Sequence, residues 1–375
     1  MKQSDFKQHL DGIHDIADRL ARPVKIMEVC GTHTVAVCRS GLRSLLPSSL
    51  KLLSGPGCPV CVTPAEYIDR AILLSRRPEV LLATFGDLMR VPGFSLGTLE
   101  KERASGARVR VVYSVSDALA LADERKSAKV IFLAVGFETT APGIAWAVKT
   151  AAERGMKNFA ILSALKTMPN AMEALLQSGG VQIDGFICPG HVSTIIGSRP
   201  YEFICRKYCR PCVVAGFEPA DVVAAIAMLL GQIEEGKCEV QNQYLRAVSA
   251  GGNPKAGLLL EEIFEPADAE WRGLGVVPQS GLRLRDKYKN YDAFSLYPDI
   301  KAPAGAEVSG CLCGEVLRGR IAPPECKLFG KKCTPTTPVG ACMVSGEGAC
   351  AAYYRYAPLA EAGGGDESPS FFKRR

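Results

Sequence analysis

The sequence predicts an α/β fold with two Rossmann-like parallel-sheet domains that face each other across a cleft, followed by a small cysteine-rich domain. Short apolar runs recur between residues 24 and 215 and alternate with stretches of helical periodicity. Many of these runs end in turns rich in glycine and polar residues, as buried parallel strands do. Beyond residue 308 cysteine and proline become dense. The last segment is therefore expected to be organised by a metal rather than by a large core.

The first domain is expected to cover residues 1–125. Residues 5–21 carry apolar side chains three and four positions apart, which predicts an amphipathic helix that Pro23 ends. Strands are predicted at residues 24–29, 50–53, 80–84 and 108–114, and further helices at residues 64–75 and 115–126.

The second domain is expected to cover residues 126–240. Strands are predicted at residues 130–135, 159–164, 185–188 and 212–215, and helices at residues 143–154, 169–177, 200–208 and 219–234. The turn at residues 29–34 resembles the turn at residues 135–140, which indicates two related units. Residues 241–375 show little sustained periodicity and are predicted to form an irregular third domain.

Composition excludes several classes of protein. The 375 residues are 47% hydrophobic and 22% charged, which is ordinary for a globular protein. The net charge of +6 is scattered and forms no basic stripe, so no nucleic-acid partner is expected. The sequence contains no run of about 18 apolar residues, so no membrane span is predicted. The charged N-terminus lacks the apolar core of a signal peptide, so a cytoplasmic location is expected. Because thiols stay reduced in the cytoplasm, the 15 cysteines indicate metal or redox chemistry rather than structural disulfides.

The strongest candidate site lies between residues 30 and 61. Cys30 and His33 follow the first predicted strand, and the Cys58-Pro-Val-Cys61 motif follows the second. Because ligands gather at the carboxyl ends of parallel strands, one thiol and one dithiol are expected in the same crevice. Cys30 is predicted to bind a soft metal or to be activated by His33, with a buried cysteine and a turn histidine as the alternative. The C-x-x-C spacing predicts a redox dithiol or a metal clamp.

Further polar groups follow other predicted strands. Asp87, Glu138 and His191 each lie in a turn after an apolar run and are candidates for proton transfer or substrate binding in the same crevice, with Lys166 as a weaker one. Helix capping is an equally good explanation for Asp87.

The C-terminal cysteines predict a second site. The set Cys311, Cys326, Cys333 and Cys350 offers four ligands to a [4Fe–4S] cluster, and zinc would accept the same set. Cys313 and Cys342 are the alternative ligands. A third group, Cys205, Cys209 and Cys212, has the spacing of radical S-adenosylmethionine enzymes, but it falls on a predicted helix end and strand start rather than in a loop.

Taken together, these motifs resemble those of the HypD family of [NiFe]-hydrogenase maturation factors. The resemblance rests on CGTH at residues 30–33, GPGCPVCVTP at 55–64, GFETTAP at 136–142, PGHVS at 189–193, GFEP at 216–219, CLCGEVLRG at 311–319 and CMVSGEGAC at 342–350. It covers nearly the whole chain, and the cysteines at 205–212 are not part of it.

The resemblance implies a scaffold on which an iron ion receives its cyanide and CO ligands. It implies a HypC-type chaperone as partner, a HypE-type donor whose C-terminal cysteine carries a thiocyanate, and contact with the hydrogenase large subunit through the chaperone. Cys30 would bind the iron, Cys58 and Cys61 would form a redox dithiol close to it, and the C-terminal cluster would supply electrons to the dithiol. The rival functions are a radical S-adenosylmethionine or dithiol oxidoreductase acting on a small molecule, and a zinc-stabilised interaction module.

Overall fold

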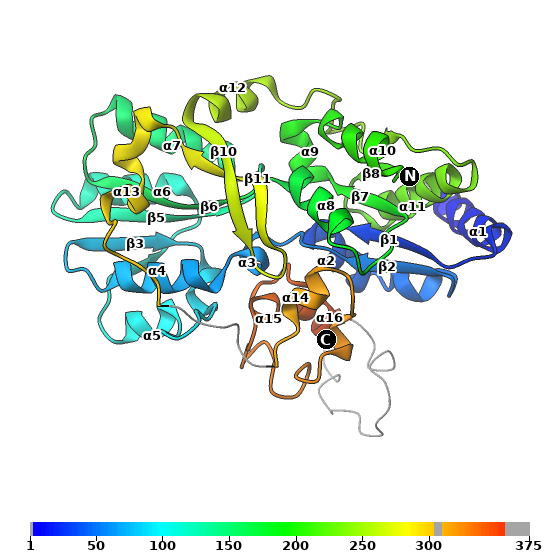
Figure 1. Ribbon diagram of the computed structural model, residues 1–375, viewed down its shortest axis with the longest axis horizontal. Helices are drawn as coiled ribbons and strands as arrows, with labels where there is room; N and C mark the ends of the chain where they lie inside the picture. Colours follow the sequence, from blue (N-terminus) through cyan, green and yellow to red (C-terminus); the bar gives the residue numbers. More distant parts are fainter. Residues whose placement is uncertain (1–2, 304–309, 357–375) are drawn as a thin grey trace.

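The computed structural model describes residues 3–303 and 310–356 and contains two parallel β-sheets, which confirms the predicted fold class (Figure 1). Sheet A has the strand order β2-β1-β7-β8-β9, and sheet B has the order β4-β3-β5-β6. The strands of sheet A are β1 (Val24–Glu28), β2 (Leu50–Ser54), β7 (Gly185–Pro189), β8 (Cys212–Ala215) and β9 (Val240–Asn242). Those of sheet B are β3 (Val80–Thr84), β4 (Val109–Val111), β5 (Lys129–Gly136) and β6 (Phe159–Leu165).

The division into sheets does not follow the expected boundary between residues 125 and 126. Strand β5 lies beside β3, with Leu82 paired to Ile131, so the boundary falls inside sheet B. Strand β7 instead lies beside β1, with Ile26 paired to Gly185. Strands β1 to β8 lie where the apolar runs predict, whereas β9, with the sequence Val-Gln-Asn, was not predicted. Their partners differ because a continuous apolar run indicates burial on both faces and carries no information about the neighbouring strand.

Helices cover both sheets, and most match the predicted ranges. Around sheet A lie α1 (Gln3–Leu20), α2 (Gly31–Arg39), α9 (Gly190–Ile196), α10 (Glu202–Tyr208) and α11 (Pro219–Glu234). On the sheet B side lie α4 (Ala65–Ser75), α5 (Leu99–Ala104), α6 (Val115–Glu124) and α7 (Ala141–Glu153), while α8 (Met168–Gln177) leads from β6 to β7. Short 3₁₀ turns are η1 (Leu42–Leu45), η2 (Gly86–Arg90), η3 (Arg199–Tyr201), η4 (Asp286–Tyr291) and η5 (Pro323–Glu325). Within the two described ranges, no helix combines the length and apolar character that crossing a bilayer requires.

A β-hairpin occupies part of the region that was predicted to be irregular. Helix α12 (Pro254–Ile263) leads into β10 (Phe264–Trp271), which pairs antiparallel with β11 (Gly275–Leu284). The sequence of β10, FEPADAEW, has large apolar side chains only at its two ends, so its alternation is weak. The hairpin descends between the two sheet units, and its tip lies near α3 (Pro59–Val62) (Figure 1). One short helix, α13 (Ala293–Leu296), follows it.

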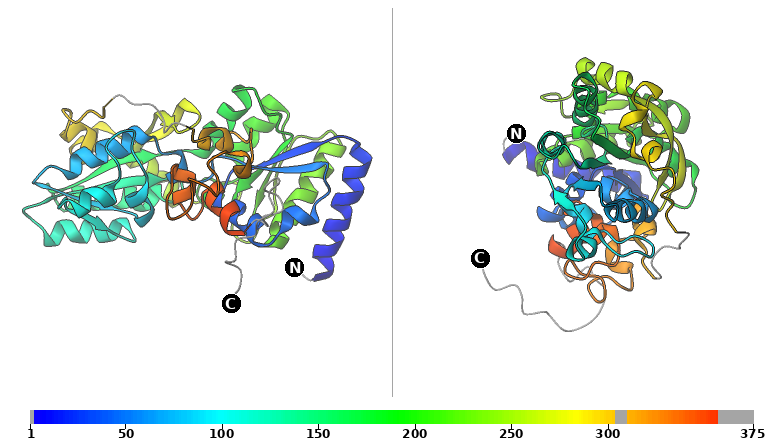
Figure 2. Two further views of the ribbon diagram at one scale, coloured as in Figure 1. Left: turned by 90° about the horizontal axis from the view of Figure 1, so that it is seen from below. Right: turned by 90° about the vertical axis from the view of Figure 1, so that its left-hand side faces the viewer.

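The cysteine-rich segment packs beneath the junction of the two sheet units (Figures 1 and 2). It contains three short helices, α14 (Cys313–Leu317), α15 (Ala341–Val344) and α16 (Ala349–Tyr356). Helix α15 contacts α3, and α16 contacts α2. The segment therefore touches both helices that follow the strands β1 and β2. Part of the predicted third domain, residues 304–309 and 357–375, lies outside the described residues.

The turns after β1 and β2 are in direct contact, as the neighbouring positions of the two strands predict. The Gly31 amide donates to the Gly57 carbonyl at 2.9 Å. A Cβ atom on Gly57 would lie 2.2 Å from the backbone nitrogen of Cys30. Only glycine fits at this position, so the close approach of the two turns depends on Gly57.

We expect Gly57→Ala to destabilise the fold by about 1–3 kcal/mol, the usual cost of overpacking, because the methyl group meets backbone that has little room to move. Gly231→Ala is the matched control. A Cβ at Gly231, in α11, meets nothing within 4 Å, so this variant should gain up to about 1 kcal/mol from helix propensity. Urea unfolding measures both. Equal midpoints for the two variants would contradict the packing argument.

Candidate functional site

A cavity of about 340 Å³ lies beside Cys30, where strand ends of the two sheets meet. Its walls come from the turns after β1, β2, β5 and β7 and from the loop before α16. Cys30, Pro59, Thr139, His191 and Glu347 are among its lining residues. The structure thus brings Cys30, the start of the C-x-x-C helix and His191 together at one site.

Cys30 is a buried thiol at the N-terminus of α2. Its side chain is 7% exposed. Burial raises the pKa of the thiol to about 12, and the Glu347 carboxylate adds to this rise. At neutral pH the group is therefore protonated. A soft metal ion would bind the thiolate and displace that proton.

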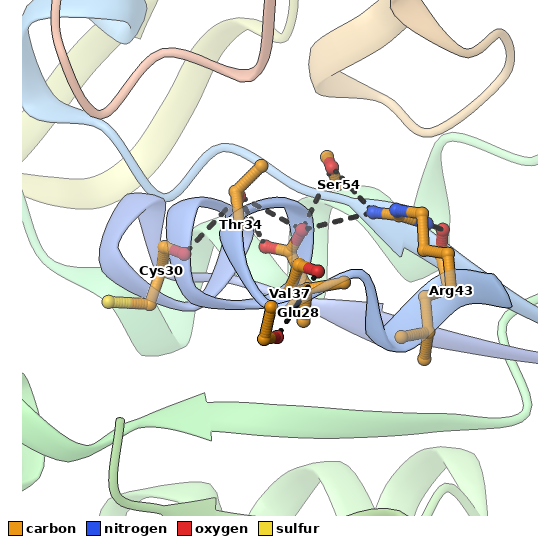
Figure 3. Close-up of polar contacts among 8 residues, drawn as sticks. Glu28, Cys30, Thr34, Val37, Arg43 and Ser54 are labelled. Carbon is orange, nitrogen blue, oxygen red and sulfur yellow. Dashed lines mark hydrogen bonds and ion pairs between the residues drawn. The ribbon is translucent and has the colours of Figure 1, made fainter. Parts of the chain in front are cut away.

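A fully buried carboxylate, Glu28, holds the strand ends behind Cys30 (Figure 3). It accepts hydrogen bonds from Thr34 Oγ1 at 2.9 Å and from Ser54 Oγ at 2.8 Å, and Arg43 lies 3.9 Å away. Burial raises the pKa of Glu28 to about 8 against the opposing charge of Arg43. Glu28 thereby connects β1, α2 and β2. In the sequence, the only indication of this buried carboxyl group was an acidic residue inside an apolar run.

Cys58 and Cys61 form a disulfide across the first turn of α3. Both side chains are buried, at 3% and 0% exposure. The Cys61 Sγ atom lies 3.9 Å from the carbonyl oxygen of Ala341, the residue before Cys342. The predicted dithiol therefore borders the cysteine-rich segment, while Pro59, between Cys58 and Cys61 in sequence, lines the Cys30 cavity.

The two predicted histidines have different environments. His33 is fully buried, its Nε2 lies 2.8 Å from the Gly216 carbonyl oxygen, and burial lowers its pKa to about 4. It is not among the residues that line the Cys30 cavity. His191 does line the cavity and stacks on Phe217 with ring centroids 3.9 Å apart. Partial burial lowers its pKa, while Glu347 opposes that effect.

The other predicted polar residues lie outside the cavity wall. Asp87 is exposed on η2. Glu138 is buried next to the wall residue Phe137, and its Oε1 accepts the Met168 amide at 2.9 Å at the start of α8. Its Oε2 has no hydrogen-bond partner within the described residues, and burial raises its pKa to about 7. Lys166 donates to the Glu270 carbonyl of the hairpin.

Sequence reasoning missed Glu347 as a site residue. Thr32 Oγ1 donates to its Oε1 at 2.8 Å, and a Cβ on Gly31 would lie 2.6 Å from its carbonyl oxygen. The carboxylate raises the pKa of both Cys30 and His191. The available sequence signal was an acidic residue between two glycines, three positions before Cys350.

All six C-terminal cysteines line one small cavity: Cys311, Cys313, Cys326, Cys333, Cys342 and Cys350. A Cβ on Gly340 would lie 2.6 Å from the Cys311 Sγ atom, so the glycine leaves room for sulfur. In the described part of the chain, no three or more His, Cys, Asp or Glu side chains form a group that could hold a metal ion. The thiols instead surround a space. A [4Fe–4S] cluster needs thiolates on several sides, and this donor set fits that need.

The Sγ atoms of Cys313 and Cys342 lie 2.7 Å apart. Two thiolates that bind different irons of one cluster cannot be so close, because each sulfur must point to its own corner of the cube. All six cysteines line the cavity, and the choice of Cys311, Cys326, Cys333 and Cys350 as ligands stays a prediction.

The triplet Cys205, Cys209 and Cys212 has the predicted structural context. Cys205 lies in α10, Cys209 is the residue that ends α10, and Cys212 begins β8. Because Cys212 is at the amino end of its strand, the triplet lies away from the carboxyl ends that form the Cys30 cavity.

These features define the class of protein. It is an α/β protein with two sheets, and a buried thiol, a disulfide and a cysteine-lined cavity lie next to one another where the sheets meet. Comparison with known proteins gives the family. Residues 4–357 match the model of the HypD family, described as "Hydrogenase formation hypA family". The chain belongs to the HypD family, which confirms the resemblance seen in its motifs.

Curated relatives are similar over most of their length. Hydrogenase maturation factor HypD of Rhizobium leguminosarum bv. viciae is 50% identical over 348 residues, covering 91% of this chain and 90% of the relative. Hydrogenase expression/formation protein HupD of Azotobacter chroococcum mcd 1 is 48% identical, with 90% of each chain covered. Hydrogenase maturation factor HypD of Cupriavidus necator is 44% identical over 359 residues, covering 91% and 94%.

The burial of Glu28 predicts a pH dependence of stability. Its pKa is raised from 4.5 to about 8, so the stability that this group contributes is complete below pH 4.5 and is lost as the pH rises through 8. Glu28→Gln removes that dependence. We expect the free energy of unfolding of the variant, relative to the unmodified protein, to rise between pH 5 and pH 8.5 by about 1.4 kcal/mol per unit of pKa shift. The difference between the two thermal unfolding midpoints, followed across this pH range, checks it. Glu100→Gln, on the surface, is the control. Parallel pH profiles for Glu28→Gln and the unmodified protein would show that Glu28 is ionised in the fold.

Proposed function

We propose that this chain is a hydrogenase maturation factor that holds an iron ion at the Cys30 cavity while the ion receives cyanide and CO ligands. The observation that carries the proposal is the succession of thiol sites: Cys30 in its cavity, the Cys58–Cys61 pair in the adjoining turn, and the six-cysteine cavity beyond Ala341. Membership of the HypD family, whose relatives are named hydrogenase maturation factors, supports it.

In this proposal Cys30 binds the incoming iron as a thiolate. Because burial keeps the free thiol protonated, binding releases a proton. His191, whose imidazole lines the cavity, is placed to accept it. His33, whose pKa of about 4 leaves it neutral, holds the turn at Gly216 rather than moving protons.

The Cys58–Cys61 pair supplies the electrons for cyanide release. Reaction of its dithiol form with a protein thiocyanate gives the disulfide, a free thiol on the donor and hydrogen cyanide, so two electrons pass from the dithiol to the donor's S–CN bond. The disulfide must then be reduced for another turnover. A [4Fe–4S] cluster held by Cys311, Cys326, Cys333 and Cys350 would supply single electrons for that step.

The partners follow from the same chemistry. A HypC-type chaperone would contribute a second thiol to the iron and carry the finished group to the hydrogenase large subunit. A HypE-type protein would present its thiocyanate at the open cavity beside Cys30. These partners come from the resemblance of the motifs.

Metal analysis tests the cluster. Anaerobically purified protein should contain about four irons and four sulfides per chain, the composition of one [4Fe–4S] cluster. Cys326→Ala should lose them, because Cys326 lines the cysteine cavity, and Cys209→Ala should keep them, because Cys209 does not. Zinc in place of iron, or iron lost in Cys209→Ala and retained in Cys326→Ala, would refute the assignment.

Substitution of Cys30 tests the iron site. Cys30→Ala should abolish delivery of iron to the chaperone while leaving the fold and the C-terminal cluster intact. The matched variant Cys38→Ala changes another buried cysteine of α2, and it should still deliver iron. Loss of folding in Cys30→Ala, measured by circular dichroism, would instead make Cys30 a structural residue.

A further inference from the structure

Arg272 is a buried cation at the tip of the β10–β11 hairpin. The residue is only 8% exposed to solvent. Its backbone amide donates to the Val62 carbonyl at 2.8 Å, and its Nε donates to the Thr63 carbonyl at 3.0 Å. Val62 ends α3, the helix that contains Cys61. One edge of the guanidinium is therefore fixed to the dithiol helix.

The hairpin tip also touches α14, the first helix of the cysteine-rich segment. A Cβ on Gly273 would lie 2.7 Å from the Gly314 Cα atom, so the two backbones touch. Gly314 directly follows Cys313, whose side chain lines the six-cysteine cavity. The hairpin tip that carries Arg272 thus lies between the C-x-x-C helix and the helix that begins at Cys313.

The positive charge of Arg272 lacks a full set of partners. Its Nη2 makes no hydrogen bond within the described residues. Burying a cation is costly unless an anion compensates it. The structure offers the cysteine cavity for that anion. A cluster with four thiolate ligands carries net negative charge, because the thiolates outweigh the charge of the iron–sulfur core.

We propose that Arg272 is the counter-charge of the group held by the six cysteines, and that its bonds to Val62 and Thr63 connect that charge to the dithiol helix. The inference rests on the proposed function, since it takes the cysteine-held group to be an iron–sulfur cluster. Arg272 acts as a positioning residue. It stabilises the more negative, reduced form of the cluster beside the disulfide that receives the electron.

The test is a potentiometric titration of the purified, cluster-containing protein, followed by visible absorbance. Arg272→Met removes the charge and keeps an unbranched apolar side chain. We expect the equilibrium constant for one-electron reduction of the cluster to fall about tenfold, which corresponds to about 59 mV toward more negative potential. Arg272→Lys keeps the charge and should shift the equilibrium by less than half as much.

Arg318→Met is the matched control. Arg318 ends α14, but it is partly exposed and paired with Glu315 at 2.9 Å. Its removal should leave the potential unchanged. An equal shift in Arg318→Met would refute a special role for Arg272, and so would an unchanged potential in Arg272→Met.

Cluster content separates the remaining outcomes. If Arg272→Met folds but loses its iron and Arg272→Lys retains it, the counter-charge is supported. If both folded variants lose their iron, the guanidinium serves packing and the inference fails. If the unmodified protein holds no iron–sulfur cluster, both the proposed function and this inference fail. If the cluster is present but its potential does not change in Arg272→Met, only this inference fails.

Discussion

The contact between the turns after β1 and β2 is the constraint on which the site depends. The Gly31 amide bonds to the Gly57 carbonyl, and Gly57 leaves no room for a side chain against Cys30. Glu28 reinforces the contact from behind, because its carboxyl group accepts hydrogen bonds from residues of both turn regions. One residue pair thus sets how near the Cys30 thiol lies to the helix that carries Cys58 and Cys61.

The hairpin extends this arrangement to the rest of the molecule. Trp271 stacks on Phe137, with ring centroids 5.9 Å apart, and Phe137 forms part of the Cys30 cavity wall. The next residue, Arg272, bonds to the end of α3, and Gly273 touches the backbone of α14. Three consecutive residues therefore contact the cavity, the dithiol helix and the cysteine-rich segment. The hairpin tip, which carries no recognised motif in the sequence, thus links these three parts of the structure.

The interior around the site favours neutral groups. Burial raises the pKa of Cys30 and of the carboxyls Glu28 and Glu138, and it lowers the pKa of His33. In such surroundings a charge is stable only beside an opposite charge or a metal. This requirement underlies both proposals, that a metal ion binds the Cys30 thiolate and that Arg272 balances the charge of thiolates in the cysteine cavity.

The sequence by itself determined the elements, the fold class, the kind of chemistry and the family. Apolar runs placed every strand of the two sheets except the edge strand β9, since burial shows directly in composition. Cysteines after glycine-rich turns indicated metal and redox chemistry at Cys30, Cys58 and Cys61, and the motifs identified the HypD family. Tertiary structure decided the partners. It placed β5 beside β3 and β7 beside β1, left Asp87 exposed, and turned His33 toward Gly216. It also brought Glu347 and Arg272 to the site from distant segments. Local patterns specify whether a residue is buried, but not which residue it meets, because that choice depends on the packing of the whole chain.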